Sequence, residues 1–470
     1  MASARAGDVV IGVDSSTQSC KVVVRDLGTG EVVRSATAPH PPGTEVDPEA
    51  WWTALDQALD EADGLGDDVR AIGVAGQQHG MVTLDDDGCV VRPALLWNDT
   101  RSAGAASALV EELGPQGWAD AVGSVPVASF TVTKLRWLAE HEPSVAARVA
   151  AVCLPHDWLT WRLRATSALD ELTTDRGDAS GTGYWSPSTG QYRHDLLERA
   201  FGRMLGVPGV ATPWAAIGET PSGVVVSAGT GDNMAAALAL RARPGDVVVS
   251  LGTSGVVSAV STHPTADPSG IVAGFADAAG NFLPLACTLN GAPVFSKVAS
   301  LLGADLDDFA EFATTAPPGA EGLVLVPYFE GERTPNLPNA HAQLHGMTLA
   351  NTTPANIARA TIEGILCGLA DALDVLVALG VTAERVLLVG GGARSAAVQD
   401  IAAAIFDLDV HVPTASEYVA EGAALQAAAA LTGEPPPWPE PPANVIEAAP
   451  AGFVRDQYRE AAEQVMKAAQ

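Results

Sequence analysis

The sequence predicts an α/β protein of two similar domains that face each other across a cleft. A valine-rich strand, a short polar turn and a second valine-rich strand occupy residues 9–26, and this pattern returns at 247–260. Alternating helical and strand-like segments follow each unit, and the stretch 241–246 separates the two halves. An internal duplication explains the repetition, although short hairpins also recur by coincidence in many folds. We expect an N-terminal domain over residues 1–242, a C-terminal domain over 243–470 and a ligand cleft between them.

The first half alternates strand and helix patterns. Strands are expected at 8–14, 21–26, 31–37, 69–76 and 223–228, and helices at 48–63 and 232–240, with helical patterns also dominating from the fourth strand to about residue 165. The segment 173–192 is rich in Gly, Ser and Thr, and it is expected to form an irregular excursion or flap.

The second half repeats the alternation. Beyond the unit at 247–260, helices are expected at 353–379, 396–406 and 452–468, and strands at 385–390 and 409–413. The proline-rich stretch 433–442 is typical of a stiff surface connector. The apolar stripes of the helices suit either the core or a homodimer face, so the sequence leaves the oligomeric state open.

The composition is that of a globular, strongly acidic protein. The 470 residues are 47% apolar and 17% charged, and the formal net charge is -30. Nucleic acids and anionic membranes need clustered cations, so neither is expected as a partner. An anionic ligand would need a site built locally from backbone N–H groups, a metal ion or a few placed side chains.

The spacing of the cysteines and the length of the apolar runs indicate in which cellular compartment the protein is expected. Five cysteines are scattered without a C-x-x-C pair, which suits a reducing environment. The start of the chain does not read as a leader peptide, and no uncharged apolar run reaches the roughly 18 residues that a membrane span needs. A cytoplasmic, soluble protein is therefore expected.

Two polar turns have the composition of anion sites. Ser and Thr hydroxyls fill the turn SSTQS at 15–19, and the turn GTSG occupies 252–255. Converging backbone N–H groups and hydroxyl donors suit phosphate, and one turn per domain would hold a polyphosphate from both sides. Asp14, at the end of the strand before the first turn, suits a Mg²⁺ anchor, or it caps its own turn.

Three further segments combine strand ends with chemistry. The strand that leads into GGGARS, 390–395, lets backbone approach a nucleotide, although G-x-G-x-x-G and P-loop spacings are absent. Asp232 follows two glycines at the start of an expected helix. Its carboxylate either caps the helix or accepts a proton from a substrate hydroxyl. Gln78 and His79 follow a buried strand, where open α/β sheets bind ligands, or they are structural.

These motifs, taken together and in order, resemble the FGGY family of carbohydrate kinases. The resemblance runs from residue 9 to about 431 and includes DSSTQSCK, AGQQHG, WNDTR, AGTGDN, SLGTSG, PYFEGERTP and GGGARS. It implies two actin-like, ribonuclease H-like domains that close over MgATP and a sugar. The motifs are most similar to those of the branch that phosphorylates a ketopentose, D-xylulose, to D-xylulose 5-phosphate.

The resemblance also implies roles for individual residues. Asp232 matches the catalytic base, and Asp14 matches the aspartate on the Mg²⁺ side. The sugar contacts implied are Gln78, His79, Trp97, Asp232 and Asn233. The ATP contacts implied are Thr17, Ser19 and Lys21 in the first phosphate loop, Gly252 and Thr253 in the second, and Gly391, Gly392 and Ala393 in the adenosine motif.

The chain departs from the family pattern at several places. Ser16 stands where glycine is common, Gln78 replaces the usual Met, and NLPNAH follows GERTP in place of an Asp-containing run. The change at Gln78 leaves the sugar open among D-xylulose, ribulose, gluconate and glycerol. Two functions outside sugar phosphorylation also stay open, a non-catalytic actin-like ATP switch and a sugar-sensing regulator. The regulator would need a basic DNA-binding segment, and none is visible in the sequence.

Overall fold

The N-terminal lobe is built on a seven-stranded mixed sheet of order β13-β14-β5-β1-β2-β3, in which β15 also pairs with β5. The computed structural model describes residues 7–469. The strands are β1 Val9–Ser15, β2 Ser19–Asp26, β3 Val32–Pro39, β5 Val69–Gly76, β13 Ala216–Glu219, β14 Val225–Ser227 and β15 Thr230–Gly231. The central strand β1 is buried along its whole length, and it pairs antiparallel with β2 and parallel with β5.

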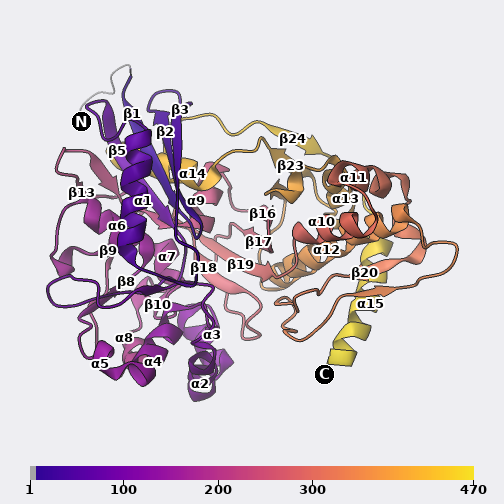
Figure 1. The fold of residues 1–470 in the computed structure, drawn as a ribbon, viewed down its shortest axis with the longest axis horizontal. Helices are drawn as coiled ribbons and strands as arrows, with labels where there is room; N and C mark the ends of the chain where they lie inside the picture. The colour runs from indigo at the N-terminus through magenta and orange to yellow at the C-terminus, as the bar shows by residue number, and fades with distance from the viewer. Residues whose placement is uncertain (1–6, 470) are drawn as a thin grey trace.

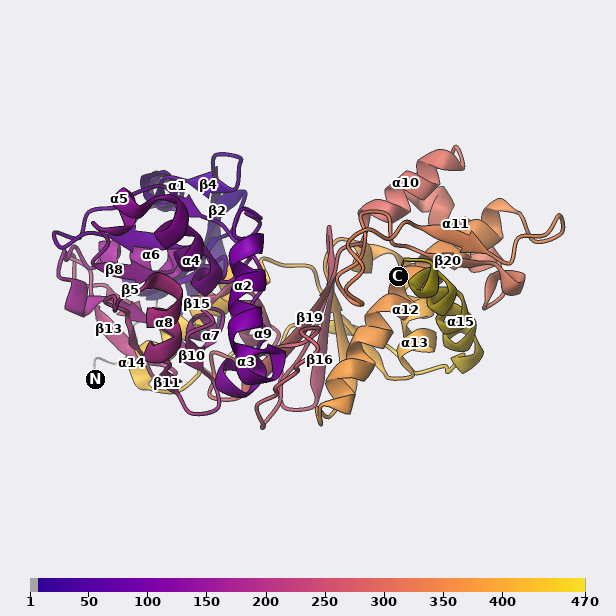
Figure 2. The same cartoon turned by 90° about the horizontal axis from the view of Figure 1, so that it is seen from below.

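The C-terminal lobe repeats this plan. Its sheet has the order β18-β19-β17-β16-β22-β23-β24. The strands are β16 Asp246–Leu251, β17 Gly255–Ala259, β18 Ala273–Ala276, β19 Phe282–Thr288, β22 Arg385–Val389, β23 Val410–Pro413 and β24 Ala443–Ile446. Here β16 pairs antiparallel with β17 and parallel with β22, as β1 does with β2 and β5. The repeated order confirms the duplicated α/β architecture, and the two lobes lie side by side (Figures 1 and 2).

Helices and short strand pairs complete the lobes. The helices of the first half are α1 Pro48–Glu61, α2 Ala103–Leu113, α3 Pro115–Val122, α4 Thr131–His141, α5 Pro143–Ala146, α6 Pro155–Leu163, α7 Arg176–Ser180, α8 His194–Phe201 and α9 Asp232–Ala239. Those of the second half are α10 Pro293–Leu301, α11 Leu306–Thr315, α12 Pro354–Ala378, α13 Ala396–Phe406, α14 Tyr418–Thr432 and α15 Gly452–Ala469. The short pairs are β4 Glu45–Val46 with β7 Ala94–Leu95, β6 Val82–Leu84 with β8 Ala151–Cys153, β9 Thr173–Thr174 with β12 Gly209–Val210, β10 Trp185–Ser186 with β11 Gln191–Tyr192, and β20 Val324–Val326 with β21 Gln343–His345.

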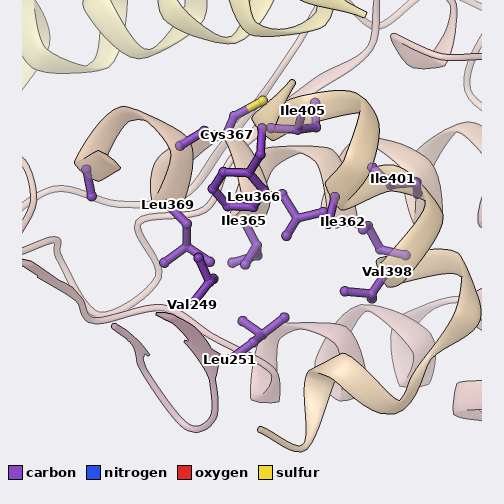
Figure 3. Packing of buried hydrophobic residues seen from close by; sticks show 14 of the residues in the cluster. Val249, Leu251, Ile362, Ile365, Leu366, Cys367, Leu369, Val398, Ile401 and Ile405 are labelled. Atoms are coloured by element: carbon purple, nitrogen blue, oxygen red, sulfur yellow. The ribbon is translucent and has the colours of Figure 1, made fainter. Parts of the chain in front are cut away.

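Each lobe has its own apolar core. In the N-terminal lobe, Ile11 and Val13 of β1 belong to one buried cluster with Trp51 and Leu55 of α1. In the C-terminal lobe, the long helix α12 packs between β16 and α13 (Figure 3). The side chains labelled there are Val249, Leu251, Ile362, Ile365, Leu366, Cys367, Leu369, Val398, Ile401 and Ile405. The apolar stripes of α12 and α13 thus serve the core.

Helix α14 comes from the second half of the chain but lies on the first sheet (Figure 1). Its backbone approaches β1 so closely that a Cβ on Gly12 would lie 1.8 Å from the carbonyl oxygen of Ala420. A Cβ on Gly422 would likewise lie 1.8 Å from the carbonyl oxygen of Ala235 in α9. Only glycine fits such contacts. The proline-rich stretch 433–442 then carries the chain back to β24. The expected domain boundary after residue 242 stays a prediction.

The segment 173–192 is not the flap that its composition indicates. It forms β9, α7, β10 and β11, and residues 174–187 are mostly buried in the N-terminal lobe. The Asp175 carboxylate accepts hydrogen bonds from the N–H groups of Gly177 and Asp178 and from the hydroxyl of Thr230, at 2.8–2.9 Å. These internal bonds satisfy the polar backbone, so a glycine-rich segment is stable in the interior. No helix among the described residues is long and apolar enough to cross a membrane.

Candidate active site

The carboxyl ends of three elements of the first sheet meet at one edge. Asp14, near the end of β1, is the register partner of Ala75 in β5. Gln78 and His79 follow β5 after one intervening residue, and Gly231, the residue before Asp232, pairs with Gly76. Parallel strands therefore bring these predicted residues to the same place, the usual ligand-binding edge of such sheets.

A cavity of about 250 Å³ lies at this edge and is lined from both lobes. All five predicted sugar contacts line it, namely Gln78, His79, Trp97, Asp232 and Asn233. The opposite wall comes from the second lobe and includes Val256, Phe275, Leu285, Cys287 and Arg333. The structure thus brings together residues that the sequence separates by more than 250 positions. The cavity is of a size for a small polyol.

His79 presents a defined hydrogen-bonding face. Its Nδ1 lies 2.6 Å from the carbonyl oxygen of Gly181, and a carbonyl only accepts, so Nδ1 carries the proton. Burial, aided by the positive charges of Lys134 and Arg333, lowers the pKa of His79 to about 3. The ring is therefore neutral near pH 7, and Nε2 is an acceptor for a ligand hydroxyl.

Asp232 is the only carboxylate among the described residues that line this cavity. Its Oδ1 accepts hydrogen bonds from the backbone N–H of Asn233 at 2.7 Å and from Asn233 Nδ2 at 2.9 Å. Burial raises the pKa of Asp232 to about 6, although the bonds from Asn233 oppose the rise. The group is thus ionised above pH 6 and basic enough to accept a proton.

Asp14 has the environment of a cation ligand. It is buried, and its Oδ1 has no hydrogen-bond partner among the described residues. Burial, followed by the negative charge of Asp232, raises the pKa of Asp14 to about 7. A carboxylate oxygen is a ligand that Mg²⁺ prefers, and a cation would relieve both effects. The residues present therefore fit a divalent cation, which Asp14 would hold.

A second cavity, of about 1130 Å³, lies within the C-terminal lobe. Gly252, Thr253, Gly391 and Gly392, four of the predicted ATP contacts, line it. Among the described residues, the backbone N–H groups of Gly391 and Gly392 have no hydrogen-bond partner and remain available to an anion. Ala393 is buried, and its N–H donates to the carbonyl of Gly390.

The first loop lies outside both cavities. Ser16 N donates to the carbonyl of Ser19 and closes the turn. Within residues 7–469, the N–H groups of Thr17 and Gln18 have no partner, as expected of a phosphate loop. Lys21 extends from β2, and its ammonium pairs with Glu417, which precedes α14. The contacts of Thr17, Ser19 and Lys21 with ATP stay predictions.

Sequence reasoning missed several residues that line the cavities. Arg333 and Cys287 reach the first cavity, and Lys297 and Arg394 reach the second. Arg333 and Arg394 lie inside the motifs GERTP and GGGARS, so their motif membership was a usable signal. Cys287 and Lys297 carry no such signal, because only the packing of β19 and α10 places them.

One buried cluster near the site has the composition of a metal centre. His156, Asp157 and Asp178 bring ligand atoms within 4.8 Å of one another. His156 Nδ1 lies 2.6 Å from Asp178 Oδ2, and its Nε2 lies 3.2 Å from Asp157 Oδ1. Burial alone would lower the pKa of His156, but the carboxylates of Asp157, Asp178 and Asp175 raise it to about 9. A protonated imidazole therefore makes the cluster an ion-pair network beside α7, although His156 Nε2, Asp157 Oδ1 and Asp178 Oδ1 have no hydrogen-bond partner among the described residues.

The fold and the site together define a class of protein. Two duplicated α/β lobes of the ribonuclease H-like plan enclose a small polyol-sized cavity with one carboxylate among the described lining residues. A hydroxyl-rich turn outside the cavities and a glycine-rich turn at the second cavity carry free N–H groups. This arrangement is that of a two-domain kinase for a small hydroxylated substrate.

Comparison with known proteins identifies the family. The model of the FGGY family of carbohydrate kinases, N-terminal domain, matches residues 9–239, and that of the C-terminal domain matches residues 247–431. The chain belongs to the FGGY family of carbohydrate kinases. It is therefore a sugar kinase, and ATP use goes with the family.

Individual relatives are similar along most of the chain. The xylulose kinase of Streptomyces coelicolor is 48% identical over 446 residues, which cover 92% of this chain and 90% of that protein. The xylulose kinase of Escherichia coli is 36% identical, with 82% of each chain covered. The crystal structure of xylulose kinase from Bifidobacterium adolescentis has a TM-score of 0.91 at 46% identity, with 97% of this chain and 99% of that chain covered. The duplicated fold and the kinase class are thereby confirmed.

Proposed function

We propose that the protein transfers the γ-phosphoryl group of MgATP to the 5-hydroxyl of D-xylulose, a ketopentose, and forms D-xylulose 5-phosphate. The observation that carries this proposal is Asp232, the single carboxylate among the described residues lining a cavity of about 250 Å³. The identity of 48% with a xylulose kinase supports the choice of sugar. A cytoplasmic location accords with this activity.

Asp232 acts as the general base in this proposal. Its Oδ1 is held by the two bonds from Asn233, so Oδ2 is the oxygen left to accept the proton of the attacking hydroxyl. His79 Nε2 accepts a hydrogen bond from a second sugar hydroxyl, and Gln78 and Arg333 supply donors. These contacts orient the hydroxyl for attack, and orientation is a large part of catalysis in phosphoryl transfer.

In this proposal, backbone N–H groups and a Mg²⁺ ion at Asp14 bind the phosphates of the nucleotide. The free N–H groups of Gly391 and Gly392 and of the turn at Thr17 suit phosphate oxygens. Asp14 would hold Mg²⁺, which when bound neutralises charge on the phosphates. The sugar cavity has walls from both lobes, so an approach of the lobes excludes water as a competing acceptor.

The test is ADP release with Mg²⁺ and a panel of D-xylulose, D-ribulose, L-ribulose, D-gluconate and glycerol. We expect strong, selective turnover with D-xylulose, and we expect Asp232→Asn to lower kcat by about 10²–10⁴. Turnover with a different polyol would overturn the assigned sugar. Sugar-dependent turnover that survives Asp232→Asn would overturn the assigned base.

A further inference from the structure

Trp97 links the sugar cavity to the first phosphate loop. Its indole lines the cavity and is 44% exposed, and its Nε1–H donates a hydrogen bond of 2.9 Å to Oγ1 of Thr17. The two residues lie 80 positions apart in the chain. One side chain therefore touches the space for the sugar and the loop that is expected to meet ATP.

The loop side of this contact is held in place. The Ser16 N–H and hydroxyl both donate to the carbonyl of Ser19, at 3.1 and 3.2 Å. His40 supports the same turn through two contacts. Its ring Nδ1 lies 2.8 Å from the carbonyl oxygen of Ser16, and its backbone N–H donates to the carbonyl of Gln18. Thr17 is half-buried in this braced turn, and Gln18 is its exposed residue.

The indole side is held by a second network. Asp99, two residues after Trp97, is buried and accepts hydrogen bonds from the Thr44 hydroxyl at 2.7 Å and from Arg101 Nε at 2.9 Å. The N–H of Leu96 donates to the carbonyl of Thr44. These bonds hold the backbone near Thr17 and near Trp97. The Trp97 indole and the Thr17 hydroxyl are therefore the groups that can reorient when a ligand binds.

The direction of the hydrogen bond determines what Thr17 offers to ATP. An indole N–H only donates, so Thr17 Oγ1 is the acceptor, and the hydroxyl hydrogen remains to donate elsewhere. The free N–H groups of Thr17 and Gln18 point to an anion as the acceptor. A sugar packed against the indole would fix its ring and hence the orientation of this hydroxyl.

We propose that Trp97 is a positioning residue that transmits occupancy of the sugar cavity to the first phosphate loop, so that sugar and ATP favour each other's binding. The proposal rests on the proposed function above. Linkage requires the effect to be reciprocal, so the sugar tightens ATP by the factor by which ATP tightens the sugar. A neutral hydrogen bond corresponds to about 2–12-fold in that factor.

The test measures this factor directly. Isothermal titration with Mg²⁺ and a non-hydrolysable ATP analogue gives the nucleotide Kd without sugar and with saturating D-xylulose, and the ratio is the coupling. Trp97→Phe keeps a ring but removes the N–H, Thr17→Val removes the acceptor, and Thr17→Ser keeps it. We expect coupling to fall about 2–12-fold in Trp97→Phe and in Thr17→Val, with no further loss in the double variant, and to persist in Thr17→Ser.

Two results would overturn the proposal. One is full coupling in Trp97→Phe with only a weaker sugar Kd, since the indole would then be a mere wall of the cavity. The other is additive loss in the double variant, since the two residues would then act separately. Failure of the assigned sugar is distinguishable, because the wild-type panel would identify a different sugar and the same coupling would be measured with it.

Discussion

Lys21 and Glu417, which are 396 residues apart, form an ion pair with a nitrogen–oxygen distance of 2.5 Å. Lys21 belongs to β2, and Glu417 is the last residue before α14. The pair therefore joins the strand after the first phosphate loop to the helix that crosses between the lobes. Lys21, which is expected to contact a phosphate of ATP, is thus already paired with a carboxylate of the protein, that of Glu417.

Glu417→Gln is expected to improve ATP binding, because ATP would no longer compete with Glu417 for Lys21. Both side chains are partly exposed, at 32% and 52%, so the pair is worth at most about 1 kcal/mol. We expect KM for ATP to fall by up to about 5-fold, measured at low ionic strength with saturating sugar. Glu463→Gln, which breaks the exposed pair with Lys467 on α15, is the matched control. An increased KM for ATP would show that Glu417 instead orients Lys21 productively.

Asp14→Asn is expected to stabilise the protein at pH 8 while it impairs catalysis. Because the pKa of Asp14 is raised to about 7, the native state holds the proton more tightly than the unfolded chain. The stability that this group contributes is thus lost as pH rises from about 4 to about 7. We expect the variant to gain about 1–4 kcal/mol of unfolding free energy over wild type at pH 8, and nothing at pH 4. Urea unfolding at both values is the measurement.

The same carboxylate predicts how Mg²⁺ acts on stability. A cation at Asp14 removes the penalty of ionisation, so Mg²⁺ is expected to raise Tm of the wild type more at pH 8 than at pH 5. Asp14→Asn should lose this response, and Asp60→Asn, at an exposed carboxyl of α1, should keep it. An equal response in Asp14→Asn would place the cation elsewhere.

The pH profile of turnover should report Asp232. With MgATP saturating, so that the bound cation keeps Asp14 ionised, the Asp232 pKa of about 6 predicts that kcat/KM for the sugar is level at higher pH and falls about tenfold per unit below pH 6. His79, with a pKa of about 3, adds no second limb in the range from pH 5 to 8. The residual activity of Asp232→Asn should lack the limb. A wild-type profile that stays level to pH 5 would contradict the assignment of Asp232 as base.

Gly12→Ala tests the close contact between strand β1 and helix α14. The new methyl group would lie 1.8 Å from the Ala420 carbonyl oxygen and 2.4 Å from Ala424 N, and both are backbone atoms that cannot rotate away. We expect a loss of about 1–3 kcal/mol or more in unfolding free energy, measured with urea. Gly104→Ala, in α2 with nothing within 4 Å, is the control and should be neutral or stabilising. Equal stability of both variants would show that α14 is free to move off β1.

Much of the fold and site followed from local pattern. The valine-rich runs at 9–26 predicted two strands around a polar turn, and the structure forms β1 and β2 there, with β1 buried along its whole length. The turn was expected to offer backbone N–H groups, and those of Thr17 and Gln18 have no partner within residues 7–469. Four of the five expected sugar residues meet in one cavity because they flank β5 or β15 at one edge of the first sheet. Trp97 reaches the same cavity from the loop after β7, which belongs to a separate two-stranded sheet.

What the sequence did not show depends on contacts far apart in the chain. Nothing local to Cys287 says that β19 forms the far wall of the sugar cavity. Helix α14 was not among the expected helices, and its place on β1 depends on glycines in two distant segments, Gly12 and Gly422. The segment 173–192 looked irregular because the Asp175 carboxylate, which accepts from the N–H groups of Gly177 and Asp178, satisfies this backbone only after folding.

Gln78 provides the sharpest test of sugar recognition. Its Oε1 accepts from Asn233 Nδ2 at 3.3 Å, and its buried Nε2 has no partner among the described residues, so that donor is available to a sugar oxygen. A lost hydrogen bond predicts a KM for D-xylulose about 2–12-fold higher in Gln78→Met. Gln78→Glu should be worse than Gln78→Met, because a carboxylate repels a sugar oxygen acceptor and adds charge beside Asp232. Steady-state kinetics with ATP saturating separates these outcomes. If Gln78→Glu bound the sugar better than Gln78→Met, the residue would serve as an acceptor, and the amide would be oriented the other way.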